Sequence, residues 1–178
     1  MNTRKALWLS ALLIVGCLAV FGVSRAIAGD WHFGFGVNTN ATARDVGLPY
    51  YPGARPHKEH HDDDSAANVW GSFGGFGMKV VAVDLETPDA PGKVASFYWA
   101  PLRQYGPILD CSYGKPRPPK AEKHSMRLDC ENEHLSPGDL QYRVGTKREF
   151  HVVAIEPRGQ GSRIALVYIQ LRGFDIDD

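Results

Sequence analysis

The feature that most constrains this fold is a succession of strand-like segments interrupted by one helical segment. From Met78 onward, apolar residues alternate with polar ones or form short runs bounded by Gly, Pro and Asp. We expect strands at residues 79–85, 108–111, 126–130, 140–144, 150–155 and 163–171. Runs of strands with one helix favour an α+β fold with an antiparallel sheet. The expected architecture is a sheet of about five to six strands with one main helix packed on one face, in two layers.

The helical segment is marked by apolar residues that recur three, four and seven positions apart. This stripe consists of Val94, Phe97, Tyr98, Leu102 and Tyr105. Its spacing predicts a helix from about residue 89 to residue 104. Pro91 suits the first turn, because the N–H that proline lacks would have no intrahelical partner there.

The first 28 residues have the pattern of an export signal. Arg4 and Lys5 precede an apolar run over residues 6–23, and Ala-Ile-Ala at residues 26–28 supplies the small residues of a signal-peptidase site. We prefer cleavage after Ala28. Since a run of this length reaches that of a membrane-spanning helix, an uncleaved anchor over residues 6–23 is the rival interpretation. A lipoprotein box at Cys17 is a third.

Charge and composition exclude two classes of protein. The chain has 20 Lys+Arg and 20 Asp+Glu, and removing the leader takes three basic residues and no acidic one. The remaining chain is mildly acidic, so we expect no nucleic-acid partner. A hydrophobic content of 43% excludes a wholly disordered chain.

Two cysteines, Cys111 and Cys130, remain once the leader is removed. In an exported domain we expect them to form a disulfide. A two-cysteine metal or redox site is the alternative, but it favours a closer spacing or a nearby third ligand.

The chain divides into three parts by composition. Residues 1–28 are the signal peptide or anchor, and residues 29–77 are a Gly-, His- and Asp-rich linker and extended segment. Residues 78–178 form the single α+β domain. Within the linker, the proline-punctuated segment 46–54 is expected to pack on the sheet with its Leu and Tyr residues inward.

The order of these elements resembles a group of small exported bacterial proteins of uncharacterised function. The resemblance rests on Tyr-Pro-Gly-Ala at residues 51–54 and on the Phe97-Tyr98 pair of the predicted helix, and it covers roughly residues 46–172. It implies a secreted or envelope-attached α+β domain. It carries over no catalytic residue.

A cluster of histidine and aspartate is the candidate metal site. Its proposed ligands are His57, His60, His61 and Asp62. Imidazole and carboxylate groups suit Zn²⁺, Cu²⁺ or Ni²⁺. The segment lacks an evident rigid frame, so we expect weak binding of a divalent metal at most, and no required cofactor.

Two further segments are candidate binding surfaces. Trp70, Phe73 and Phe76 alternate with glycines, and their rings either bind a glycan, a peptide or a bilayer edge or fold back on the sheet. The second segment is a proline-stiffened cationic loop with Lys115, Arg117, Lys120 and Lys123. It either docks on an anionic lipid or polymer or is simply solvated.

The sequence contains no motif that identifies a catalytic site, and we assign no catalytic residue. It lacks Gly-x-Ser-x-Gly, His-Glu-x-x-His, a Walker loop and a dinucleotide fingerprint. We therefore expect an exported, non-catalytic binding module in the periplasm or on the outer face of the inner membrane. Its expected partner is peptidoglycan, anionic lipid or another envelope protein. A periplasmic metal-binding protein and a hydrolase-like enzyme with dispersed residues are the alternatives.

Overall fold

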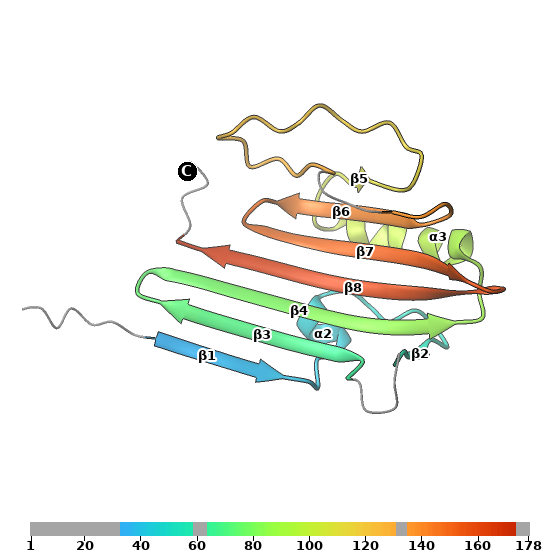
Figure 1. Ribbon diagram of the computed structural model, residues 1–178, viewed down its shortest axis with the longest axis horizontal. Helices are drawn as coiled ribbons and strands as arrows, with labels where there is room; N and C mark the ends of the chain where they lie inside the picture. The colour runs from blue at the N-terminus through green and yellow to red at the C-terminus, as the bar shows by residue number, and fades with distance from the viewer. Residues whose placement is uncertain (1–32, 59–63, 131–134, 174–178) are drawn as a thin grey trace, which may run out of the picture. The chain divides into compact units, whose positions relative to one another are not determined.

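The computed structural model describes residues 33–58, 64–130 and 135–173. Within these ranges the chain forms an eight-stranded antiparallel sheet in the order β1-β3-β4-β8-β7-β6-β5, with β2 also paired to β4 (Figure 1). The strands are β1 (Phe33–Asn38), β2 (Arg55–Pro56), β3 (Ala66–Phe73), β4 (Phe76–Thr87), β5 (Leu109–Asp110), β6 (Leu140–Thr146), β7 (Glu149–Arg158) and β8 (Gly161–Arg172). The helices are α2 (Ala43–Val46) and α3 (Pro91–Arg103).

The expected two-layer fold of five to six strands and one main helix is wrong. The described residues contain eight strands and two helices. The additional strands β1, β2 and β3 come from the segment that we expected to be a linker. Residues 126–130, expected to be a strand, have no regular structure, although the carbonyl of Met126 accepts a hydrogen bond from the backbone N–H of Lys147 at 2.9 Å.

The two helices cover one face of the sheet. Helix α3 begins with Pro91 in its first turn and buries Val94, Tyr98 and Leu102 against β6, β7 and β8. Helix α2 packs on β4 and β8. The segment that follows α2 brings Leu48 and Tyr51 into the same core.

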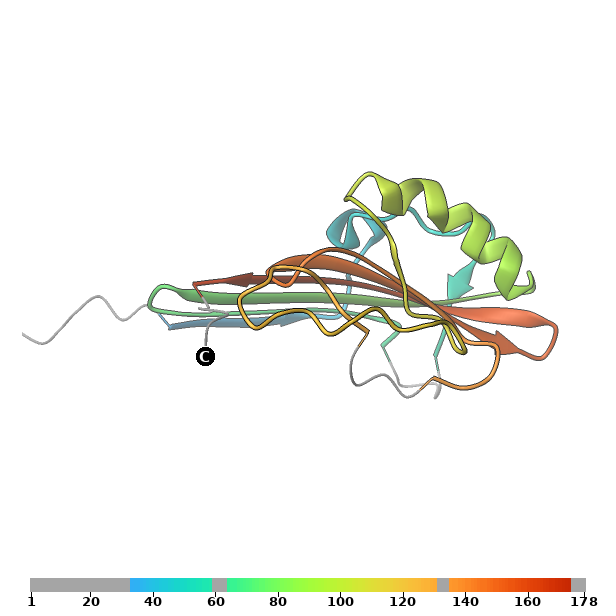
Figure 2. The same ribbon diagram turned by 90° about the horizontal axis from the view of Figure 1, so that it is seen from above.

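The sheet is longer than the helical layer. Strand β4 buries Val81, Val83 and Leu85 beneath the helices. The end of β4 that joins β3 extends past them, together with β1 (Figure 2). Within the described residues the helices therefore cover one half of the sheet, which we call the covered half. The other half contains β1 and the ends of β3 and β4 that join each other, and we call it the hairpin end.

A disulfide closes the long loop between β5 and β6. Cys111 and Cys130 are bonded, with their Cα atoms 5.5 Å apart, as predicted. Arg127 donates hydrogen bonds to the carbonyls of Pro119 (2.7 Å) and Lys120 (3.3 Å) across this loop. A disulfide fits an oxidising compartment.

The predicted export signal or anchor at residues 1–28 lies outside the described residues. Among the residues that are described, no helix has the length and apolar character needed to cross a membrane.

Candidate functional site

The β3–β4 hairpin carries the three aromatic residues that we predicted to bind, and it presents them on opposite faces. Phe73 pairs with Phe76 across the turn, so these two rings share a face. Trp70 pairs with Lys79, and its position on β3 places it on the other face. Gly74 has a φ of 57°, which glycine adopts without strain, and closes the turn. The hairpin end therefore offers two separate candidate surfaces.

The first surface is apolar and lies on the face opposite the helices. Its most exposed side chains are Phe35, Val37, Phe73, Phe76 and Met78, which we call the apolar patch. Cross-strand register puts Phe35 and Met78 opposite Gly71 in one row and Phe73 beside Phe76 in the next. Phe35 is 62% exposed and Phe73 49% exposed. Both helices lie on the other side of the sheet (Figure 2).

The same face becomes charged toward the far end of β4. Arg163 forms an ion pair with Asp84 at 3.1 Å and a longer one with Glu156 at 3.8 Å. All three residues lie on the open face by strand alternation, because Val83 and Ile164 beside them point into the core. The apolar surface is therefore confined to the hairpin end.

The second surface is built around Trp70, on the helix side of the hairpin end. A Cβ atom placed at Gly36 would lie 2.5 Å from the indole ring, and one at Gly34 would lie 3.0 Å from it. The ring therefore rests directly on the backbone of β1, in space that two glycines leave open. Its outer side faces solvent, and Trp70 is 46% exposed. We call the indole and these two glycines the Trp70 platform.

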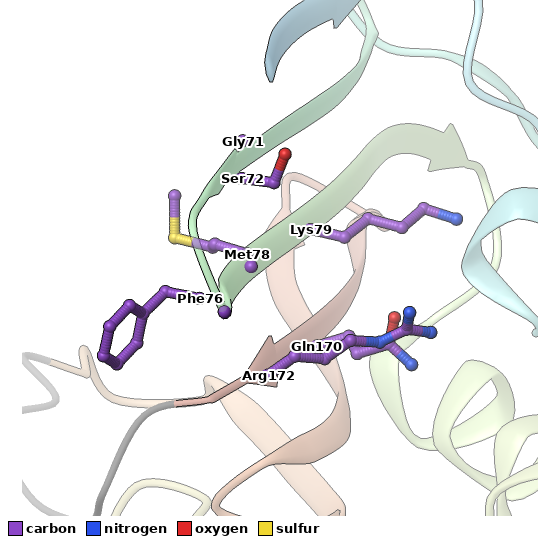
Figure 3. Close-up of a pocket in the computed structure, with 9 residues that line it drawn as sticks. Gly71, Ser72, Phe76, Met78, Lys79, Gln170 and Arg172 are labelled. Carbon is purple, nitrogen blue, oxygen red and sulfur yellow. The ribbon is translucent and has the colours of Figure 1, made fainter. Parts of the chain in front are cut away.

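A hollow of about 450 Å³ lies next to this platform, because Lys79, the cross-strand partner of Trp70, is one of the residues that line it. Ser72, Lys79, Gln170 and Arg172 line it from β3, β4 and β8. Figure 3 shows Lys79, Gln170 and Arg172 pointing to one side of the hairpin, whereas Phe76 and Met78 point to the other. The ammonium group of Lys79 also lies 5.7 Å from the ring centroid of Tyr168. Three glycines, Phe76 and Met78 complete the lining, so the polar and basic side chains occupy one side of a partly apolar hollow.

A stack of rings joins this surface to the core. His151 lies between Tyr105 and Tyr168, with ring centroids 3.9 and 4.9 Å away. Burial lowers the pKa of His151, because desolvation disfavours the imidazolium form. Burial also raises the pKa of Tyr168 to about 12, and its hydroxyl donates to the Glu149 carboxylate at 2.7 Å. The rings of Tyr105, His151 and Tyr168 pack against one another. Their contacts with other described residues indicate no catalytic role.

The predicted cationic loop is separate from both surfaces. In the sheet order, β8, β7 and β6 lie between β4 and β5, where this loop begins, and β8 and β7 lie between β4 and β6, where it ends. Lys115 pairs with Asp110 at 3.8 Å, and Arg117 donates to the carbonyl of Cys130. Lys120 and Lys123 are exposed on the same loop. Arg117 thus links two parts of the same loop. The structure does not bring the loop's Lys and Arg side chains to Trp70, Phe73 or Phe76.

The predicted metal ligands are divided by the limits of the described residues. His60, His61 and Asp62 lie outside them. The Nδ1 atom of His57 lies 3.0 Å from a carboxylate oxygen of Glu86. The described part of the chain contains no group of three or more His, Cys, Asp or Glu side chains placed to hold a metal ion. The metal site stays a prediction.

Comparison of this chain with protein-family models, with curated proteins and with solved structures finds no match. The resemblance to small exported bacterial proteins therefore stays a prediction. Function has to be argued from the two surfaces of the hairpin end.

Proposed function

We propose that this protein is an exported binding module of the cell envelope that docks on an anionic lipid bilayer through the apolar patch. The observation that carries this proposal is the gathering of exposed Phe, Val and Met side chains on one face of the hairpin end. A contiguous exposed apolar surface on a water-soluble domain favours contact with a protein or a membrane. The disulfide supports an exported location.

The entry point of the chain favours a membrane as the partner. Phe33, the first residue of β1, pairs with Phe73, so the chain enters the sheet at the end that carries the patch. In the sequence, residues 24–32 separate the apolar run from Phe33, and these residues span at most about 30 Å when extended. An uncleaved anchor would thus keep the patch within reach of the bilayer, and in a cleaved protein the patch would bind by itself.

Basic residues near the patch favour anionic headgroups. Lys147 and Arg148 form the turn between β6 and β7. The carbonyl of Arg148 accepts a hydrogen bond of 2.7 Å from the N–H of Leu171, which places this turn beside the end of β8. Each Lys or Arg near an anionic surface contributes roughly 1 kcal/mol to attraction.

Vesicle co-sedimentation tests this proposal. Protein that begins at Gly29 is mixed with vesicles of anionic or zwitterionic phospholipid, so that the leader cannot supply the binding. Replacing Phe73 and Phe76 together with Ser should lower the partition into anionic vesicles at least 10-fold, because each ring contributes about 1–2 kcal/mol when it leaves water. A matched control replaces Tyr113 and Trp99, which are also exposed, with Ser.

The control variant should bind as the parent does, and the parent should prefer the anionic vesicles. Partition that the Phe73/Phe76 variant leaves unchanged, with its fold intact by circular dichroism, would contradict the proposal. Equal partition into the two kinds of vesicle would contradict the part assigned to the basic residues.

A further inference from the structure

We infer that the Trp70 platform and its hollow form a second binding site, for an acidic glycan, on the face opposite the apolar patch. This inference does not depend on lipid binding, because it uses different side chains on a different face. It rests on an indole held flat against glycine backbone beside a hollow that polar side chains line on one side.

The indole of Trp70 is held in place by two glycines of β1. Gly36 and Gly34 leave room that any other residue would fill, since a Cβ at Gly36 would lie 2.5 Å from the ring. The ring therefore has one face on β1 and the other toward solvent. The C–H groups of a pyranose carry partial positive charge and pack well against the negative face of an aromatic ring. A ring that is already held flat loses little conformational freedom on binding.

The side chains around the hollow supply the polar part of the site. Ser72 and Gln170 both donate and accept hydrogen bonds, as recognition of sugar hydroxyl and amide groups requires. Lys79 and Arg172 add two positive charges on the same side of the hairpin (Figure 3). The side chains of Gln170 and Arg172 form no hydrogen bond or ion pair with another described residue.

The cations of this face are the basis for expecting an acidic ligand. Two carboxylates also lie near the hollow, and they keep their negative charge although they accept hydrogen bonds. Glu149 accepts from the Tyr168 hydroxyl at 2.7 Å, and Asp45 accepts from the Thr42 N–H at 2.9 Å and the Thr42 hydroxyl at 2.7 Å. Because Asp45 already acts electrostatically on Lys79, Arg172 is the cation that a glycan carboxylate would meet. A phosphate group would use the same cation but has no need of the indole, and this difference can be tested.

Isothermal titration of the full chain with three probes tests the inference. The probes are a soluble peptidoglycan fragment that carries carboxylates, a neutral N-acetylglucosamine oligomer of similar length, and inorganic phosphate. The acidic fragment should bind most tightly. Trp70→Ala should weaken binding of both glycans at least 10-fold, whereas Arg172→Gln should weaken binding of the acidic fragment more than that of the neutral one. Trp99→Ala and Arg103→Gln, which change exposed residues of α3, are the matched controls and should change neither affinity.

A second variant fills the hollow without removing a polar group. A Cβ at Gly77 would meet its nearest atom, the Cβ of Arg172, at an ordinary 3.8 Å, so Gly77→Val should fold. It should also weaken glycan binding at least 10-fold, because the added methyl groups occupy the hollow. Glycan affinities that Trp70→Ala and Gly77→Val both leave unchanged would overturn the inference.

Two further results would overturn it in distinguishable ways. Phosphate that binds as tightly as the acidic fragment, and regardless of Trp70, would show an anion site without glycan recognition. Loss of vesicle binding in Trp70→Ala would place the indole in the lipid contact. Vesicle binding that depends on Phe73 and Phe76 but not on Trp70 would support two sites on two faces.

Discussion

The two ends of strand β4 differ in their surroundings although they belong to one continuous strand. At one end Val81, Val83 and Leu85 are buried beneath the helical layer. At the other end Phe76 and Met78 are 48% and 43% exposed. The two sets of residues also lie on opposite faces of the strand, because Val81, Val83 and Leu85 point to the helices whereas Phe76 and Met78 point to the open face. On that open face the far end of the strand carries Asp84 and Glu86 in place of apolar residues.

The covered half accounts for stability, and the hairpin end carries the candidate binding surfaces. The covered half holds the hydrophobic core and both helices. The hairpin end has neither helix over its apolar face, and it holds the apolar patch and the Trp70 platform. A rigid sheet can thus extend binding surfaces beyond the part that keeps it folded. Substitutions in the two halves should therefore have different consequences.

The largest expected effect is on folding, from a core residue beneath the helices. Leu166 is fully buried and pairs with Val83. Leu166→Ala should lower the free energy of unfolding by about 2–5 kcal/mol, because it leaves a cavity as well as losing apolar burial. Phe76→Ala at the hairpin end should change this free energy by less than about 1 kcal/mol. Urea denaturation of the two variants measures the contrast.

An equal loss of stability in Leu166→Ala and Phe76→Ala would contradict the expected difference between the two halves. It would mean that another part of the protein covers Phe76 in solution, and that the apolar patch belongs to a core.

Removal of the disulfide should have the next largest effect. Replacing Cys111 and Cys130 with Ser should lower the free energy of unfolding by about 3 kcal/mol, since the unfolded chain regains the entropy of a loop of about 20 residues. Vesicle binding measured below the melting temperature should not change, because the strands that flank the loop, β6 and β5, are separated from β4 by two and three strands. Lost vesicle binding by a folded Ser variant would instead assign lipid contact to the cationic loop.

Much of the covered half could be predicted from the sequence, because its side chains repeat with regular periods. The alternation around Val81 and Val83 marks β4, and the stripe through Val94 and Tyr98 marks α3. The strand expected at residues 126–130 fails for a local reason. There Met126 and Asp129 offer carbonyls to the Lys147 N–H and the Arg143 side chain, and these contacts replace the regular pairing of a strand.

The hairpin end was not predicted because glycine, which is depleted in strands, fills alternate positions of β1. Phe33, Phe35 and Val37 recur at every second residue, with Gly34 and Gly36 between them on the face where the indole of Trp70 rests. One signal was available: Gly74-Gly75 lies between two aromatic-containing runs, as in a two-residue hairpin turn. Had that turn been recognised, the odd spacing of Trp70 and Phe73 would have placed them on opposite faces.

The smallest expected effect concerns the boundary between the two halves, where His151 lies between Tyr105 and Tyr168. Burial lowers its pKa in the folded protein, although a hydrogen bond that the imidazole donates to the backbone of Val46 and the charge of Glu149 act in the other direction. In the unfolded chain the imidazole titrates near its ordinary value of about 6.5. As the pH falls through that value, the unfolded chain takes up a proton before the folded protein does, so the free energy of unfolding decreases.

Replacing His151 with Phe tests whether this boundary belongs to the covered half. A phenyl ring fits between two aromatic rings and does not titrate, so the melting temperature of His151→Phe should fall less between about pH 7 and pH 5 than that of the parent. His124→Gln, at an exposed position on the disulfide loop, is the matched control and should keep the parental slope. Thermal unfolding followed by circular dichroism at several pH values measures it. If His151→Phe kept the parental slope, the imidazole would be as accessible to protons in the folded protein as in the unfolded chain, and the covered half would end before the ring stack.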